Sequence, residues 1–133
     1  MAGFLNCYAG VTSPTVLVVD DEPLVRWSVS ETLTDSGYRV MQAGDALSAL
    51  EAINGKGGAA DLVLLDLRLP DSSDLGVLSM MRRLSPRTPI ILMTAHGSEA
   101  LAADARARGA YAVINKPFDM SMLPPLVRRA MSG

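Results

Sequence analysis

The fold of this chain is indicated by the stretch VLVVDDEP at residues 16–23, in which four apolar residues lead into two acids and a proline. A short β-branched run of this kind is typical of a buried strand. Pro23 suits the first turn of a helix, where its missing N–H would be unpaired anyway. Leu24, Trp27 and Leu33 then fall on nearby faces of that helix. The stretch therefore predicts a strand that leads directly into a helix, with carboxylates at the junction.

The same alternation of short apolar runs and longer helical patterns continues to the end of the chain. Helices are expected at about residues 23–36, 45–53, 75–84, 98–108 and 122–131. Strands are expected at residues 16–19, 38–42, 62–65, 90–93 and 112–114. The first, third and fourth of these strands are apolar on both faces, as in a parallel sheet with helices on both sides. Five such units predict an α/β fold, a single three-layer domain around a doubly wound, five-stranded parallel sheet.

Length and composition indicate one globular domain. The chain has 133 residues, 49% of them hydrophobic, and a net charge of -2 from 12 basic and 14 acidic residues. This charge gives no electrostatic reason to expect binding to nucleic acid or to a membrane. The single cysteine, Cys7, allows no intramolecular disulfide and agrees with a reducing compartment.

No apolar run reaches the roughly 20 residues of a membrane-spanning helix. Residues 1–7 lack the basic start and long apolar stretch of a secretory signal, so a cytoplasmic protein is expected. Residues 1–13 are predicted to be a loosely ordered leader, and residues 14–131 the folded domain. The chain is either a stand-alone domain or one taken from a longer protein.

Chemically distinctive side chains follow four of the predicted strands. Asp20 and Asp21 follow the first, and Asp66, Thr94 and Lys116 follow the third, fourth and fifth. Because the carboxyl ends of parallel strands meet at one edge of a sheet, these groups should converge. Two carboxylates about 4 Å apart repel by on the order of 4 kcal/mol at an effective dielectric near 20, so the cluster needs a cation or a raised pKa. Mg²⁺ suits it, because this small hard ion prefers oxygen ligands and retains waters that a phosphate can replace.

Each of these residues also has an ordinary explanation. Asp20 and Asp21 could cap the first helix, Thr94 could cap the fourth, and Asp66 could be a simple loop acid. Lys116 could be a solvated surface charge, although a cis peptide before the following proline is one way to turn it toward the acids. Their joint occurrence at four strand ends favours the functional interpretation.

These segments resemble the receiver domain of bacterial two-component response regulators. The matching stretches are VLVVDDEP at residues 16–23, DLRLP at 66–70, ILMTA at 91–95 and KPF at 116–118. The stretches MTAHG at 93–97 and KPFD at 116–119 are similar to receivers of the NtrC-like class. The resemblance covers residues 14–131 and implies a flavodoxin-like fold with strand order 2-1-3-4-5.

The resemblance also implies a role for each site residue. Asp66 would be the phosphoacceptor. Asp21 would bind Mg²⁺ directly and Asp20 mainly through water, with the Arg68 backbone carbonyl and Asp66 completing the protein ligands. Once Asp66 is phosphorylated, the phosphoryl oxygens would be held by Thr94 and Lys116.

The implied function is that of a signalling receiver rather than an enzyme, although the domain would assist its own phosphorylation and dephosphorylation. The phosphoryl donor would be a sensor histidine kinase or a phosphotransfer protein. Phosphorylation would change the surface formed by the fourth helix, fifth strand and fifth helix. That surface would bind an output module or target protein, regulate transcription through it, and support homodimer formation. Direct contact with nucleic acid or a membrane is not implied.

The sequence departs from the family pattern in two places. Family members often carry Tyr or Phe three residues before the lysine, where this chain has Val113; Tyr111, two residues earlier, should lie on the same face of the strand. This substitution argues against an aromatic rotamer switch. Ser73 and Asp74 replace the usual Asp-Gly, which implies a different shape for that loop.

Two other classes of function compete with this interpretation. A phosphatase of the haloacid dehalogenase type also uses a nucleophilic aspartate and Mg²⁺, and Glu22 follows Asp20 at the spacing of its second acid, but its cap domain and remaining motifs are not evident. A flavodoxin-like cofactor binder is disfavoured, because acids, rather than a hydroxyl- or glycine-rich phosphate loop, follow the first strand.

Overall fold

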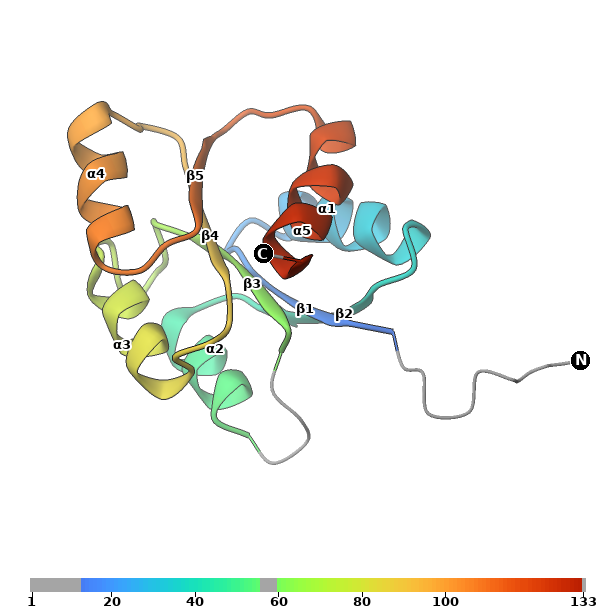
Figure 1. Cartoon of the computed structure of the whole chain (residues 1–133), viewed down its shortest axis with the longest axis horizontal. Helices are drawn as coiled ribbons and strands as arrows, with labels where there is room; N and C mark the ends of the chain where they lie inside the picture. The colour runs from blue at the N-terminus through green and yellow to red at the C-terminus, as the bar shows by residue number, and fades with distance from the viewer. Residues whose placement is uncertain (1–12, 56–59, 133) are drawn as a thin grey trace, which may run out of the picture.

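The computed structural model describes residues 13–55 and 60–132. They form a five-stranded, all-parallel sheet in the order β2-β1-β3-β4-β5 (Figure 1). Its strands are β1 (Thr15–Val19), β2 (Arg39–Ala43), β3 (Leu62–Asp66), β4 (Ile90–Thr94) and β5 (Ala112–Asn115). The predicted strand order is confirmed. The predicted leader at residues 1–13 lies outside the described residues except for its last position.

Helices cover both faces of the sheet in the described residues. They are α1 (Pro23–Asp35), α2 (Ala46–Ile53), α3 (Gly76–Leu84), α4 (Glu99–Ala107) and α5 (Leu123–Ser132), with a short 3₁₀ turn, η2 (Met120–Met122), before α5. Every predicted helix and strand boundary lies within one residue of the observed one. Pro23 accounts for the start of α1, and Gly37 and Gly109 account for the ends of α1 and α4, because these two glycines adopt the positive φ that ends a helix.

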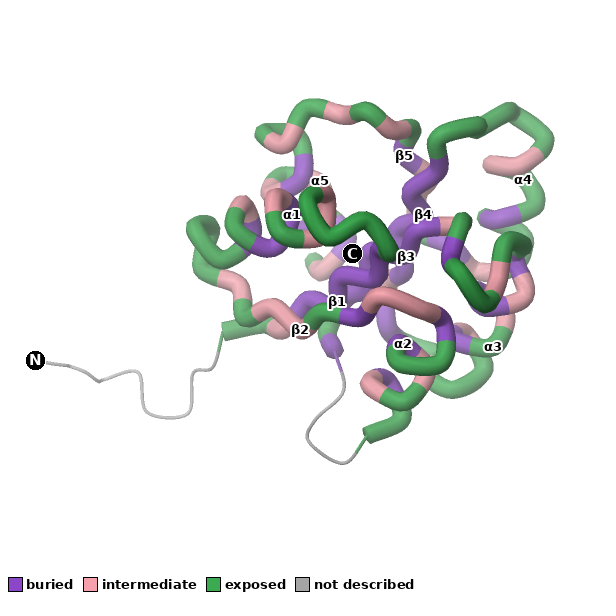
Figure 2. Tube along the Cα trace, turned by 180° about the vertical axis from the view of Figure 1, so that it is seen from behind, coloured by how far each residue is buried: buried purple, intermediate pink, exposed green. Residues whose placement is uncertain are grey.

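The core consists of two apolar layers separated by the sheet. Leu17 and Val19 of β1 face α2, α3 and α4, whereas Val16 and Val18 face α1 and α5. In Figure 2 the central strands are buried along their length and the helices are buried mainly on their inner sides. Because helices cover both faces of the sheet, successive residues of these strands are all apolar and do not alternate with polar ones.

Two large apolar residues of α1 lie outside this core. Val29 and Leu33 are fully buried, but Leu24 and Trp27 are 73% and 58% exposed. Leu47 of α2 is likewise exposed. Helical spacing alone does not reveal this, because only the position of the helix on the sheet decides which part of its apolar surface is covered.

The N-terminus of α2 is held by a residue from the loop that follows β3. Asp71 accepts hydrogen bonds from the backbone N–H groups of Ala46 (2.8 Å) and Leu47 (3.0 Å). Asp45 accepts another from the N–H of Ser48 (2.7 Å). Carboxylates therefore satisfy the otherwise unpaired N–H groups of this helix end. The loop after Asp66 is thereby tied to α2.

Asp71→Asn is expected to lower the free energy of unfolding at neutral pH. The N–H groups of Ala46 and Leu47 hold the pKa of Asp71 below its usual value. A carboxylate with a lowered folded-state pKa stabilises the fold above its unfolded pKa, near 4, and loses this contribution as the pH falls through the folded value. Urea unfolding of both proteins should therefore differ near pH 7, and the difference should shrink as the pH falls from about 4 through the lower folded-state pKa of Asp71.

Asp35→Asn, at an exposed position at the end of α1, serves as the matched control and should not reduce stability. A wild-type-like Asp71→Asn protein at neutral pH would show that the contact contributes nothing measurable.

Candidate functional site

The predicted site residues converge at the carboxyl edge of the sheet. Asp66 ends β3 and Thr94 ends β4, whereas Asp20 directly follows β1 and Lys116 directly follows β5. The strands are in register there, since Asp66 pairs with Met93 and Thr94 with Asn115. Parallel pairing therefore brings together groups that are up to 96 residues apart in sequence.

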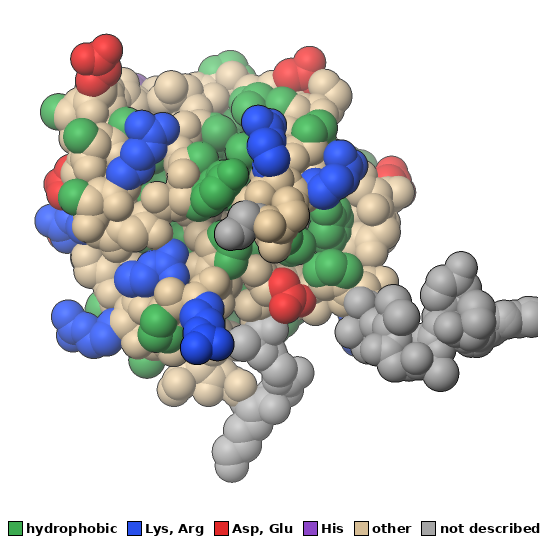
Figure 3. All heavy atoms as spheres, viewed as in Figure 1, with side chains coloured by type: hydrophobic (Ala, Val, Ile, Leu, Met, Phe, Trp, Pro, Cys, Tyr) green, Lys and Arg blue, Asp and Glu red, His purple; other side chains and the backbone are tan. Residues whose placement is uncertain are grey.

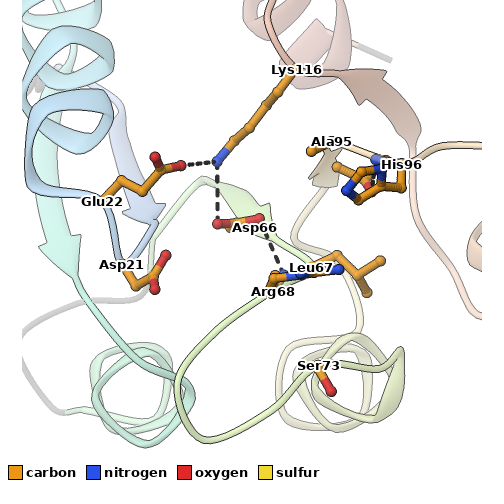
Figure 4. A pocket seen from close by; sticks show the side chains of 10 residues that line it. Asp21, Glu22, Asp66, Leu67, Arg68, Ser73, Ala95, His96 and Lys116 are labelled. Atoms are coloured by element: carbon orange, nitrogen blue, oxygen red, sulfur yellow. Dashed lines mark hydrogen bonds and ion pairs between the residues drawn. The ribbon is translucent and has the colours of Figure 1, made fainter.

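These strand ends border a cavity of about 300 Å³ (Figure 4). Its lining includes Asp21, Asp66, Thr94 and Lys116, as the sequence predicts. Other lining residues come from the loops after β3 and β4, namely Arg68, Ser73 and His96. Asp66 is 5% exposed and Thr94 3% exposed. The cavity thus gives solvent access to a mostly buried carboxylate.

The three aspartates form a cluster with the chemistry of a cation site. Asp20, Asp21 and Asp66 each offer a carboxylate oxygen, and these oxygens lie within 4.8 Å of one another. Asp20 is fully buried, whereas Asp21 is exposed and gives access from solvent. A set of hard oxygen donors with one open side fits a small divalent cation that keeps part of its water shell.

Lys116 supplies positive charge to this cluster. Its Nζ lies 2.6 Å from Asp20 Oδ2, 3.2 Å from Asp66 Oδ2 and 3.4 Å from Glu22 Oε1. Figure 4 shows the lysine side chain reaching across the cavity to Glu22 and Asp66. The peptide bond between Lys116 and Pro117 is cis, as the sequence suggested. The interpretation of Lys116 as a solvated surface charge is wrong, since its side chain is only 13% exposed.

Burial and ion pairing change the proton affinity of two of these groups. The pKa of Asp66 is raised, chiefly because burial disfavours its charged form; the Arg68 N–H and the charge of Lys116 oppose this, and the charge of Asp20 adds to it. For Lys116, burial alone would lower the pKa. The hydrogen bond to Asp20 and the charges of Asp20 and Asp66 outweigh burial, so the pKa of Lys116 is raised and the lysine remains protonated.

The helix-capping alternatives are wrong. The N-cap of α1 is Glu22, which makes no side-chain capping bond, and Asp20 Oδ1 instead accepts from the Glu22 N–H (2.9 Å). The N-cap of α4 is Ser98. Thr94 Oγ1 accepts from the N–H of His96 (3.2 Å), which leaves the threonine at the cavity wall.

Sequence reasoning missed one basic residue near the cluster. Arg26 on α1 donates from Nη1 to the backbone carbonyl of Asp20 (2.6 Å). It also missed that Glu22 contacts Lys116. Neither contact has a motif of its own, although Arg26 lies only five residues after Asp21 on the helix that starts at the site.

Of the two departures from the family pattern, only the Ser73–Asp74 loop reaches the cavity, since Val113 lies within β5 and Tyr111 precedes that strand. Val113 is partly buried and packs against the core layer that faces α2, α3 and α4. Tyr111, just before β5, is 42% exposed. Ser73 lines the cavity, and Asp74 Oδ1 accepts from the N–H of Gly76 (2.8 Å).

Fold and site together define a doubly wound α/β domain with a lysine-bridged acidic cluster at the carboxyl edge of its sheet. Residues 16–128 match the sequence profile of the response regulator receiver domain. The chain belongs to this receiver domain family.

Individual relatives agree with this assignment. The chain is 34% identical over 117 residues to the DNA-binding transcriptional regulator NtrC of Escherichia coli (strain K12), a match that covers 88% of this chain and 24% of that protein. Among solved structures, the receiver domain of NtrX from Brucella abortus is 39% identical with a TM-score of 0.80, covering 88% of this chain and 98% of that one. The chemotaxis protein CheY4 of Vibrio cholerae is 29% identical with a TM-score of 0.81, covering 90% and 99%.

The chain spans about a quarter of the length of the curated NtrC relatives that it matches. Among helices in residues 13–55 and 60–132, none combines the length and apolar character needed to cross a bilayer.

Proposed function

We propose that this domain accepts a phosphoryl group on Asp66 and acts as the receiver of a two-component phosphorelay. The observation that carries the proposal is the position of Asp66, a buried carboxylate at a cavity wall, paired with Lys116 and next to two further aspartates. Family membership of residues 16–128 supports it. We assign the domain to residues 14–131.

We further propose that the acidic cluster holds Mg²⁺ through Asp20, Asp21 and Asp66, with the Arg68 backbone carbonyl as an additional ligand. The clustered carboxylate oxygens and the exposed position of Asp21 fit this ion. When bound, Mg²⁺ would neutralise charge on the transferring phosphoryl group.

The protein groups then have defined tasks in the transfer. A carboxylate oxygen of Asp66 attacks the phosphorus of a phosphohistidine on a sensor kinase or phosphotransfer protein, and the bond from phosphorus to the histidine nitrogen breaks. Lys116 Nζ is already 3.2 Å from Asp66 and can offset charge on the phosphoryl oxygens, and the hydroxyl of Thr94 can donate to one of them. The contribution of the protein is thus mainly positioning and electrostatics.

The new acyl phosphate would add negative charge at Asp66 and redirect Lys116 and Thr94 toward it. We propose that the loop after β4 and helix α4 respond, and that the surface of α4, β5 and α5 changes its affinity for a partner. Figure 3 shows hydrophobic and basic side chains side by side on the face that carries α5, a composition suited to a protein partner. With Val113 in β5, we propose that this response does not use an aromatic rotamer.

The NtrC relatives are DNA-binding transcriptional regulators. We therefore propose that this receiver is of the NtrC-like class, works in the cytoplasm, and controls transcription through an attached or separate output module. Phosphorylation would favour a homodimer of the domain.

The phosphatase alternative is disfavoured by geometry. Its nucleophile would be Asp20, but this side chain is fully buried and hydrogen-bonded to Lys116. Asp66 lines the cavity, whereas Asp20 does not.

Incubation with acetyl phosphate tests the proposal. With Mg²⁺, intact-mass spectrometry should show one added phosphoryl group. Excess EDTA should slow the addition by about 100-fold or more, because a bound cation contributes several kcal/mol to such a transition state. A third sample, in Ca²⁺-free buffer with no metal added, serves as the control. Labelling that is equally fast in EDTA would contradict the metal-dependent mechanism, and no labelling with Mg²⁺ would contradict the proposed acceptor function.

A further inference from the structure

Arg26 lies outside the cavity but contacts the backbone that carries the acids. Its Nη1 donates to the carbonyl oxygen of Asp20 at 2.6 Å, and its Nε donates to Gln42 Oε1 at 3.2 Å. The guanidinium therefore links α1 to the loop after β1 and to β2. Hydrogen bonds from a charged donor are stronger than neutral ones, particularly when partly buried.

The backbone N–H, the backbone carbonyl and the carboxylate of Asp20 each form hydrogen bonds. Its N–H donates to the carbonyl of Ala43 (3.1 Å), and its carboxylate accepts from the Glu22 N–H (2.9 Å) and from Lys116 (2.6 Å). Arg26 supplies the contact to its carbonyl. Because the Asp20 carbonyl and the Asp21 N–H belong to one planar peptide unit, a fixed carbonyl also sets the plane from which Asp21 projects.

The chain leaves room for this contact. A Cβ atom at Gly44 would lie 3.1 Å from Arg26 Nη1, closer than ordinary van der Waals contact. At the end of β2, Gln42 thus accepts a hydrogen bond from the guanidinium, and Gly44 leaves space for it because it has no side chain. These two contacts limit the orientations that Arg26 can adopt.

We propose that Arg26 is a positioning residue for the cation site. It acts through the peptide between Asp20 and Asp21 and holds the exposed carboxylate of Asp21 where it can share a divalent cation with Asp20 and Asp66. This inference rests on the proposed Mg²⁺ binding of the cluster and adds a residue that does not itself touch the ion.

The sign of the effect separates positioning from charge. If Arg26 acted only as a nearby positive charge, its removal would strengthen Mg²⁺ binding, because like charges repel. If Arg26 positions Asp21, its removal weakens binding. Loss of a partner that orients a metal ligand typically reduces affinity by about 10- to 100-fold.

Isothermal titration of the full chain with MgCl₂ tests the inference. Arg26→Gln is expected to raise the Mg²⁺ dissociation constant at least about tenfold. Arg26→Lys should recover part of the affinity, since an ammonium can donate to the Asp20 carbonyl but cannot bind Gln42 in the same fork. Gln42→Ala, at an exposed position, should give a smaller loss. Arg128→Gln, on the exposed side of α5, removes the same charge elsewhere and should bind Mg²⁺ as the wild type does.

Thermal unfolding of each variant in EDTA supplies the second measurement. A merely structural role would lower the unfolding temperature in EDTA and leave the Mg²⁺ affinity of the folded protein unchanged, which would overturn the inference. Unchanged or tighter binding in both Arg26→Gln and Gln42→Ala would also overturn it. Failure of the wild type to bind Mg²⁺ would instead overturn the proposed metal site.

Discussion

Asp66→Asn is expected to abolish the addition of a phosphoryl group from acetyl phosphate in the presence of Mg²⁺. Asparagine has nearly the same shape as aspartate, but its amide oxygen is a poor nucleophile and cannot form the acyl phosphate. Intact-mass spectrometry of the wild type should show one added phosphoryl group, and the variant should show none over the same time.

Misfolding is not expected to account for this loss. Burial raises the pKa of Asp66, which means that the folded protein disfavours its charged form. A neutral side chain at this position should therefore leave stability unchanged or increase it. Asp74→Asn, in the loop that follows Asp66 but not in the cavity lining, is the matched control and should be phosphorylated normally. Labelling of Asp66→Asn at the wild-type level would disprove the assignment.

Lys116→Met is expected to lower the free energy of unfolding in EDTA by about 3 kcal/mol. Lys116 is the cation that contacts both Asp20, which is fully buried, and Asp66. Its removal leaves these carboxylates close together without a counter-charge, and breaking a buried ion pair on one side is strongly destabilising. Urea unfolding in EDTA measures the loss.

Mg²⁺ should restore much of the lost stability of Lys116→Met, because a cation bound by the same carboxylates replaces the missing charge. The wild type should gain less from Mg²⁺. Arg129→Met, at an exposed position on α5, serves as the control for the loss of one positive charge. If Lys116→Met were as stable as the wild type in EDTA, the ion pairs would not contribute to folding as described.

Most of the fold can be predicted from the sequence, because strong local signals mark its elements. Pro23 starts α1, and Gly37 and Gly109 end α1 and α4, so these boundaries depend on a few residues with restricted or unusual backbone preferences. The residue types at the strand ends could also be recognised in advance. Parallel pairing makes any residue at the end of one strand a neighbour of those at the ends of adjacent strands.

Contacts that carry no local signal could not be predicted. The hydrogen bonds of Asp71 to the start of α2 join residues 24 and 25 positions apart, and no spacing rule connects them. The exposure of Trp27 is similar, because its neighbours are decided by how α1 lies on the sheet.

The sequence by itself determined the alternation of strands and helices and the convergence of Asp66, Thr94, Lys116 and the Asp20–Asp21 pair, because both follow from local patterns and the geometry of a parallel sheet. The strand order was implied by the resemblance to receiver domains. Only the tertiary structure decided how these groups are paired. The position of Lys116 between Asp20 and Asp66, and of Arg26 on the Asp20 carbonyl, depends on distances of about 3 Å across different elements. Such distances are set by the packing of the whole domain, which no short segment encodes.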